Sequence, residues 1–202
     1  MFSTIRNVLG LIFFVALIFV WRKGSSRFGR KKMVIAAVIS VALVIILAFI
    51  PLENTVVTFS TPEEAFGHYY VGDYDNMDIV EGELTTFVVG KKEGVEKFLI
   101  IPKTEKGWKV GLGIDIKWVV NSRSDGLVIN VFQYKGTDEY FIVIRDLFGT
   151  VHEISDAHGS NFIKGKRDDK ADNKKLVTYY AYIPYFSDEY TLVVNGTEII
   201  LK

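Results

Sequence analysis

The stretch MVIAAVISVALVIILAFIPL, from Met33 to Leu52, contains 20 residues and no charged side chain. As an α-helix with a rise of about 1.5 Å per residue, it would span ~30 Å, the thickness of the hydrocarbon core of a bilayer. Pro51 falls at its end, where a helix stops without losing an interior hydrogen bond. The pattern predicts a transmembrane helix at residues 33–52.

A second apolar run precedes it, from Val8 to Trp21, and predicts another span at about residues 3–21. A cleaved signal peptide is disfavoured because Trp21, Arg22 and Lys23 stand where a small-residue cleavage site would be needed. A re-entrant or peripheral helix stays open as an alternative, because the uninterrupted run has only 14 residues. Together the two runs predict a transmembrane helical hairpin over residues 1–52.

The charges divide the chain into two unlike parts. Residues 1–52 contain seven Lys or Arg and no acid, whereas residues 53–202 contain 17 Lys or Arg and 24 Asp or Glu. Six of the seven cations lie in the segment 22–32, between the apolar runs, and short basic loops stay in the cytoplasm. This predicts a two-span protein of the cell membrane with an extracellular C-terminal domain. The predicted partners are the lipid bilayer and an envelope or membrane protein, and not nucleic acid.

The absence of cysteine excludes disulfides, a lipoprotein anchor and thiolate zinc sites. An extracellular domain built without disulfides depends on its own core, which about 150 residues can supply. This favours the surface of a Gram-positive bacterium.

Residues 53–113 predict a small α+β subdomain. Thr61 is placed as the N-cap of a short helix, with Pro62 in its first turn and Glu64 as the capping-box partner. The run FLII, residues 98–101, is apolar on both faces and predicts a central strand.

Residues 114–202 predict an all-β, antiparallel, sandwich-like subdomain. In IDIKWVV (residues 114–120) the alternation predicts a half-buried strand with Trp118 facing inward. Asn195-Gly196 lies between two β-type runs, which predicts a hairpin with a two-residue turn. The charged segment 165–175 predicts a solvated loop.

Three short motifs resemble a loose group of uncharacterised, membrane-anchored, exported proteins of Gram-positive bacteria. They are TPEEAF at residues 61–66, the acidic-aliphatic strand at Met77–Glu81, and Gly107-Trp108-Lys109. The resemblance covers roughly residues 60–112. It implies an extracytoplasmic location and an α+β start to the domain, and it implies no activity and no site residue.

No catalytic constellation emerges from the sequence, and no cofactor is predicted. His152, Glu153, Asp156 and His158 contain metal-ligating atoms, but they lack the HExxH spacing of zinc proteases, and alternate residues of a strand face opposite ways. The acidic residues at 168–173 are interleaved with cations and do not match an EF-hand. No metal site is therefore predicted.

Tyrosines concentrate in the last third of the chain, where exposed aromatic side chains could stack on a glycan or anchor a protein partner. A core-packing role is the alternative. Tyr180, Tyr182 and Tyr185 are the residues predicted to be exposed and ligand-binding.

The sequence as a whole favours a non-enzymatic, membrane-tethered, extracytoplasmic binding, sensing or adaptor module. Two alternatives stay open: an accessory subunit of an envelope transporter or secretion complex, and a hydrolase of cell-wall polymers or peptides centred on residues 152–158.

Overall fold

The computed structural model describes residues 15, 18, 35, 38–42, 57–70, 72–110, 115–166, 175–187 and 189–202. The chain divides into two compact units, Met1–Val57 and Thr58–Lys202. Nearly all described residues belong to the second unit, which is mainly β and antiparallel. The proposed division at Gly113 and the charged residues 167–174 lie outside the described residues.

The predicted two-helix membrane hairpin is overturned. In the described part of the chain, no helix is both long and apolar enough to cross a bilayer. The predicted spans, about 3–21 and 33–52, fall largely outside the described residues.

The fold class is accordingly corrected to a mainly β domain, and the assignment to a multi-pass protein of the cell membrane is withdrawn with the hairpin on which it depended.

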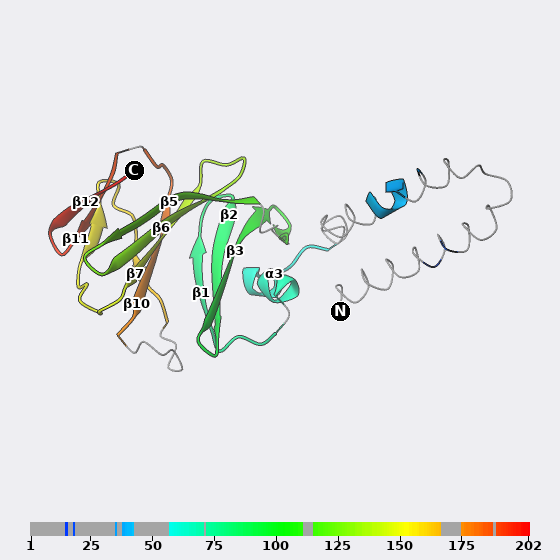
Figure 1. Cartoon of the computed structure of the whole chain (residues 1–202), viewed down its shortest axis with the longest axis horizontal. Coiled ribbons are helices and arrows are strands. Elements are labelled where there is room, and N and C mark those ends of the chain that lie inside the picture. The colour runs from blue at the N-terminus through cyan, green and yellow to red at the C-terminus, as the bar shows by residue number, and fades with distance from the viewer. Residues whose placement is uncertain are drawn as a thin grey trace. The chain divides into compact units, whose positions relative to one another are not determined.

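The second unit stacks one helix and three antiparallel sheets in layers (Figure 1). The outer helix is α3 (Pro62–Tyr69), and it covers a four-stranded sheet in the order β1-β2-β3-β4. A five-stranded sheet, β5-β6-β7-β10-β9, follows, and a three-stranded sheet, β12-β11-β8, closes the other side. The strands are β1 (Asn76–Glu81), β2 (Thr85–Lys92), β3 (Val95–Thr104), β4 (Gly107–Trp108), β5 (Ile116–Ser124), β6 (Leu127–Tyr134), β7 (Tyr140–Asp146), β8 (Ile154–Asp156), β9 (Ile163–Lys164), β10 (Val177–Ile183), β11 (Tyr190–Val194) and β12 (Thr197–Leu201).

Helix α3 begins as its sequence predicts. The Thr61 side chain accepts a hydrogen bond from the Glu64 N–H, and the Glu64 carboxylate accepts one from Ser60. Ala65 and Phe66 are buried against the four-stranded sheet, where Phe66 lies close to Gly90. A Cβ at position 90 would lie 2.6 Å from the Phe66 ring, so glycine is what allows this contact.

The last hairpin is confirmed. Asn195 and Gly196 have φ angles of 51° and 79°, and Val194 pairs with Thr197. Positive φ at both central residues matches the right-handed twist of paired strands. The predicted burial of residues 98–101 is confirmed for Leu99, Ile100 and Ile101. Their predicted position in a central strand is wrong, because β3 pairs there with β2, while the short β4 pairs only with Lys103 and Thr104.

The prediction for Trp118 is wrong. A register shift between Trp118 and Val120 interrupts the pairing of β5 with β6, so the simple alternation ends there. Val120 is buried, whereas the Trp118 side chain is 54% exposed and packs edge-on against Phe132 at 4.8 Å.

The five-stranded sheet is buried on both faces because its strands place apolar side chains alternately on each side. In β7, Ile142 and Ile144 pack toward the three-stranded sheet, while Phe141 and Val143 pack toward the four-stranded sheet. The buried sheet therefore separates two cores, and the candidate sites lie at the edges of these cores.

Candidate functional site

The structure separates the three tyrosines that the sequence predicts to be exposed. Tyr180 is fully buried, and its ring lies 6.2 Å from that of Phe87. Tyr182 is half-buried beside Glu139, and burial together with the Glu139 and Glu83 charges raises the pKa of its hydroxyl to about 12. Tyr185, beyond the end of β10, is 59% exposed.

Tyr180 and Tyr182 differ from Tyr185 in exposure because of the strand face on which they lie. Residues 180 and 182 lie on the same strand face, and that face packs against the four-stranded sheet. The predicted exposure of Tyr180 is therefore wrong. Only Tyr185 of the three is available to a ligand on an open surface.

Tyr185 belongs to a group of stacked rings that we call the aromatic corner: His158, Tyr185, Phe186 and Tyr190. The buried Tyr190 ring lies between two others, with centroids 5.1 Å from Phe186 and 5.8 Å from His158 and interplanar angles of 23° and 22°. The Tyr185 ring stands edge-on to His158 at 6.3 Å. Since His158 and Tyr185 are exposed, the corner presents two rings to solvent on a fixed aromatic base.

Asp156 holds the aromatic corner in place. Its carboxylate accepts hydrogen bonds from the N–H groups of His158 (3.0 Å) and Ser160 (2.9 Å) and from the Tyr190 hydroxyl. Burial by itself would raise the pKa of this carboxyl, but the hydrogen bonds from Ser160, Tyr190 and His158 outweigh that effect and lower it. The Tyr190 pKa is raised, by burial first and by Asp156 next. The ionised carboxylate is therefore a structural part of the corner.

The chain around the aromatic corner is acidic. Residues 147–163 and 176–201 contain no Lys or Arg, and their acids are Glu153, Asp156, Asp188, Glu189 and Glu198. These stretches supply β8, β10, β11 and β12. Within these two stretches the formal charges are all negative, and Lys202 follows Leu201, the strand partner of Tyr190.

The histidines and acids of residues 152–158 do not converge. The N–H groups of His152 and Glu153 both donate to the Asn195 side-chain oxygen, at 3.0 and 3.2 Å, while Asp156 binds its own turn and Tyr190. Across the described ranges, no group of three or more His, Asp or Glu is arranged to hold a metal ion.

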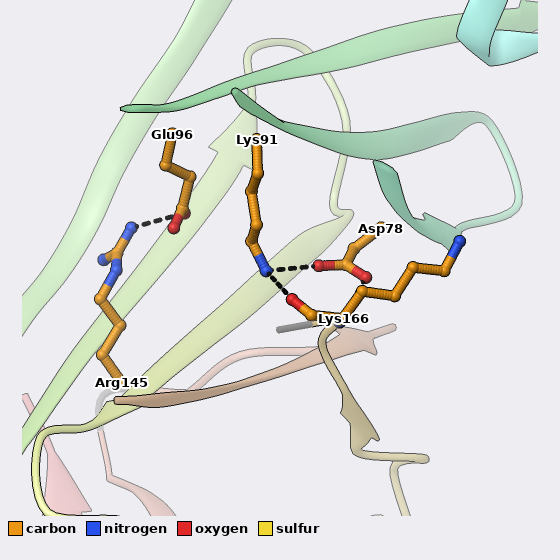
Figure 2. A network of polar contacts seen from close by, with 5 residues as sticks. All are labelled: Asp78, Lys91, Glu96, Arg145 and Lys166. Atoms are coloured by element: carbon orange, nitrogen blue, oxygen red, sulfur yellow. Dashed lines mark hydrogen bonds and ion pairs between the residues drawn. The ribbon is translucent and has the colours of Figure 1, made fainter. Parts of the chain in front are cut away.

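A second cluster, which the sequence analysis missed, lies between the four- and five-stranded sheets (Figure 2). We call it the inter-sheet polar cluster: Asp78, Lys91, Glu96, Arg145 and Lys166. Lys91 Nζ lies 2.7 Å from Asp78 Oδ2, and the two side chains are only 9% and 5% exposed. Arg145 on β7 binds Glu96 on β3 at 2.9 Å and so joins the two sheets.

The segment after β9 completes this cluster. The Lys166 N–H donates to Asp78 Oδ1 at 2.8 Å, and the Lys166 carbonyl accepts from Lys91 Nζ at 2.7 Å. A sequence signal was present. Asp78 lies two residues before Val80 on β1, and Lys91 lies two residues after Val89 on β2. Each charged side chain is therefore on the strand face that turns toward the core. A charge at such a position predicts a buried partner.

Two further buried carboxylates are used structurally. Glu139 accepts hydrogen bonds from the Leu84 N–H at 2.7 Å and the Thr85 hydroxyl at 2.6 Å, which ties β2 to the turn before β7. Asp146 accepts from the N–H groups of Phe148, Gly149 and Val151 and closes the turn after β7. Both carboxylates are therefore engaged in hydrogen bonds that hold the fold together.

Comparison with protein-family models, with curated proteins and with solved structures finds no match for this chain. The function must therefore be argued from the geometry of the aromatic corner and of the inter-sheet polar cluster.

Proposed function

We propose that residues 58–202 form a non-catalytic binding module that recognises a cationic segment of a partner protein through the aromatic corner. The observation that carries the proposal is the exposed pair of rings, Tyr185 and His158, standing on the buried ring of Tyr190. Rigid aromatic side chains lose little conformational entropy on binding and commonly act as interface anchors.

Charge decides which ligand class the corner suits. The five acids of residues 147–163 and 176–201 have no Lys or Arg among them, so this part of the chain attracts cations. An ammonium or guanidinium group can also lie over the face of Tyr185, which adds about 0.5–1 kcal/mol at an exposed site. A Lys- or Arg-containing peptide satisfies both features, whereas an anionic polymer would be repelled.

The architecture supports binding rather than catalysis. Asp156, which binds the backbone of His158, already accepts hydrogen bonds from two backbone N–H groups and from Tyr190. The hydrogen bonds lower its pKa, which keeps it ionised and unsuited to donate a proton near neutral pH.

The test is binding of a short lysine-rich peptide to the full-length chain, compared with the same peptide carrying Glu in place of Lys. We expect only the cationic peptide to bind, and Tyr185→Ala to weaken it several-fold. Affinity should fall as salt rises, because the exposed charges are screened.

Phe148→Ala is the matched control, since Phe148 is 60% exposed and Tyr185 59%. It should leave affinity unchanged. Equal binding of the two peptides, or equal losses in the two variants, would contradict the proposal.

A further inference from the structure

The amine of Lys91 and the carboxyl of Asp78 meet in a setting that suits a chemical reaction between them. They lie on the adjacent strands β2 and β1, on the sheet face that packs against the five-stranded sheet. Nζ and Oδ2 are 2.7 Å apart, with both side chains nearly buried. Two groups that can condense to an amide are therefore held in contact by the fold.

The backbone of Lys166 orients both partners. Its N–H donates to Asp78 Oδ1, the oxygen that would remain as the carbonyl of an amide. A donor at this position stabilises negative charge developing on that oxygen when the carboxyl carbon is attacked. Its C=O accepts from Lys91 Nζ and fixes the direction of the amine.

Gly165 allows this approach. A Cβ at position 165 would lie 3.0 Å from Asp78 Oδ2 and 2.6 Å from the Tyr180 ring. Any larger residue would push the Lys166 backbone away from the two reacting groups.

We propose that Lys91 and Asp78 become joined by an intramolecular isopeptide bond between β1 and β2. A proton passes from Nζ to Oδ2, the neutral amine attacks Cγ, and the Nζ–Cγ bond forms as the Cγ–Oδ2 bond breaks. Two of the three ammonium protons leave with Oδ2 as one water molecule, and the third stays on the amide nitrogen. The positive and negative charges cancel, so no oxidant, reductant or other reactant is needed.

Burial and proximity both drive the step. The fold has removed two charges from water, which costs free energy that a neutral amide does not carry. Two reactants held in the right geometry behave as if present at an effective concentration of about 10⁵ M or more, which compensates for the poor reactivity of an amine toward a carboxylic acid. The released water leaves a buried interface, so the reverse hydrolysis is disfavoured.

The experiment is mass spectrometry of the folded, full-length chain after denaturation. We expect a mass below that of the sequence by one water. Tryptic digestion should not cleave after Lys91, and it should release a branched peptide that joins residues 78 and 91. A chain kept in denaturant from the moment of lysis should retain the full mass, because only the folded protein brings the groups together.

Lys91→Arg should keep the full mass, since a guanidinium preserves the cation but is a poor nucleophile. Lys103→Arg is the matched control: Lys103 pairs with Glu81 at 3.9 Å with exposed side chains, so this variant should still lose water. The peptide map separates the isopeptide from dehydration at Asp125-Gly126, which would leave Lys91 cleavable.

The decisive sample is wild-type protein incubated for days in native buffer. The proposal is overturned, and the contact is an ordinary ion pair, if this protein retains the full mass and trypsin cleaves normally after Lys91. This result is decisive even if Lys91→Arg does not fold. The bond does not depend on the proposed peptide binding, so either proposal can fail alone.

Discussion

The two faces of the five-stranded sheet are built from different chemistry. Toward the three-stranded sheet the core is mostly aliphatic, with Ile129, Ile142 and Ile144 at its centre. Toward the four-stranded sheet it is mostly aromatic: the Phe87 ring lies 5.8 Å from Phe132 and 5.5 Å from Phe141. Only the aromatic face ends in the inter-sheet polar cluster.

The difference shows how one sheet can serve two kinds of interface. The aliphatic face depends mainly on close packing, with hydrogen bonds from Tyr179 and Tyr190 at its margin, whereas the aromatic face also brings ion pairs to its edge. Aliphatic contacts are non-directional, while Asp78, Lys91, Glu96 and Arg145 admit few alternative pairings, so the second interface has its register defined by charge as well as by shape.

The largest effect is expected from Phe87→Ala, which removes the ring shared by Phe132, Phe141 and Tyr180. It should lower the free energy of unfolding by about 3–5 kcal/mol, because the packed sheets cannot collapse into the cavity. Denaturant unfolding measures the change. A loss under about 1 kcal/mol would show that the two sheets are not packed as described.

Relative to protein of full mass, in which Asp78 and Lys91 are still an ion pair, Asp78→Ala should cost about 3 kcal/mol, since it leaves the Lys91 cation buried without its carboxylate. The double variant with Lys91→Met should recover most of that loss, because no charge then remains to be buried. Chemical denaturation of the single and double variants makes the comparison. Equal free energies of unfolding for the single and the double variant would mean that the cluster stabilises the fold through contacts other than charge pairing.

Ile144→Val tests the aliphatic face and should cost about 1 kcal/mol, the usual result of removing one buried methylene. Val143→Ala, its neighbour on the aromatic face, removes more volume and is expected to cost more. Unfolding curves with unchanged slope would show that both act on stability alone. A larger loss of stability for Ile144→Val than for Val143→Ala would indicate that the aromatic face is the more loosely packed.

The smallest effect on stability is expected at alkaline pH, where Tyr182 ionises. The folded pKa of Tyr182, about 12, exceeds the ordinary value of 10.0 for tyrosine. Its contribution to stability is therefore complete below pH 10 and is lost as the pH rises through about 12. The near-ultraviolet absorbance of tyrosinate should show one ionisation fewer in this range for Tyr182→Phe. An unchanged titration would place the raised pKa on another tyrosine.

Much of the β structure could be predicted from local pattern. The final hairpin and the cap of α3 follow from turn and capping chemistry, which act over a few residues. Strand β8 begins only at Ile154, because the Val151 N–H donates instead to Asp146 in the preceding turn. The two-residue β9 is too short to leave any pattern.

The candidate sites were less accessible to sequence reasoning. Tyr185 was identified, but Tyr180 and Tyr182 were assigned to a surface that is in fact covered by the four-stranded sheet. Asp78, Lys91 and Lys166 are far apart in sequence, and no local rule brings Lys166 to the other two. The membrane hairpin predicted from hydropathy is corrected, because the described part of the chain contains no helix that is long and apolar enough to cross a bilayer.

The sequence alone determined which segments of this protein pair as hairpins and which side chains alternate, because these depend on backbone preferences and on neighbouring residues. The tertiary structure decided which strand face is solvated, which tyrosine is presented and which charges meet. Those outcomes depend on how whole sheets stack, and sheet stacking is determined by the sum of many weak, non-directional contacts between residues distant in the chain.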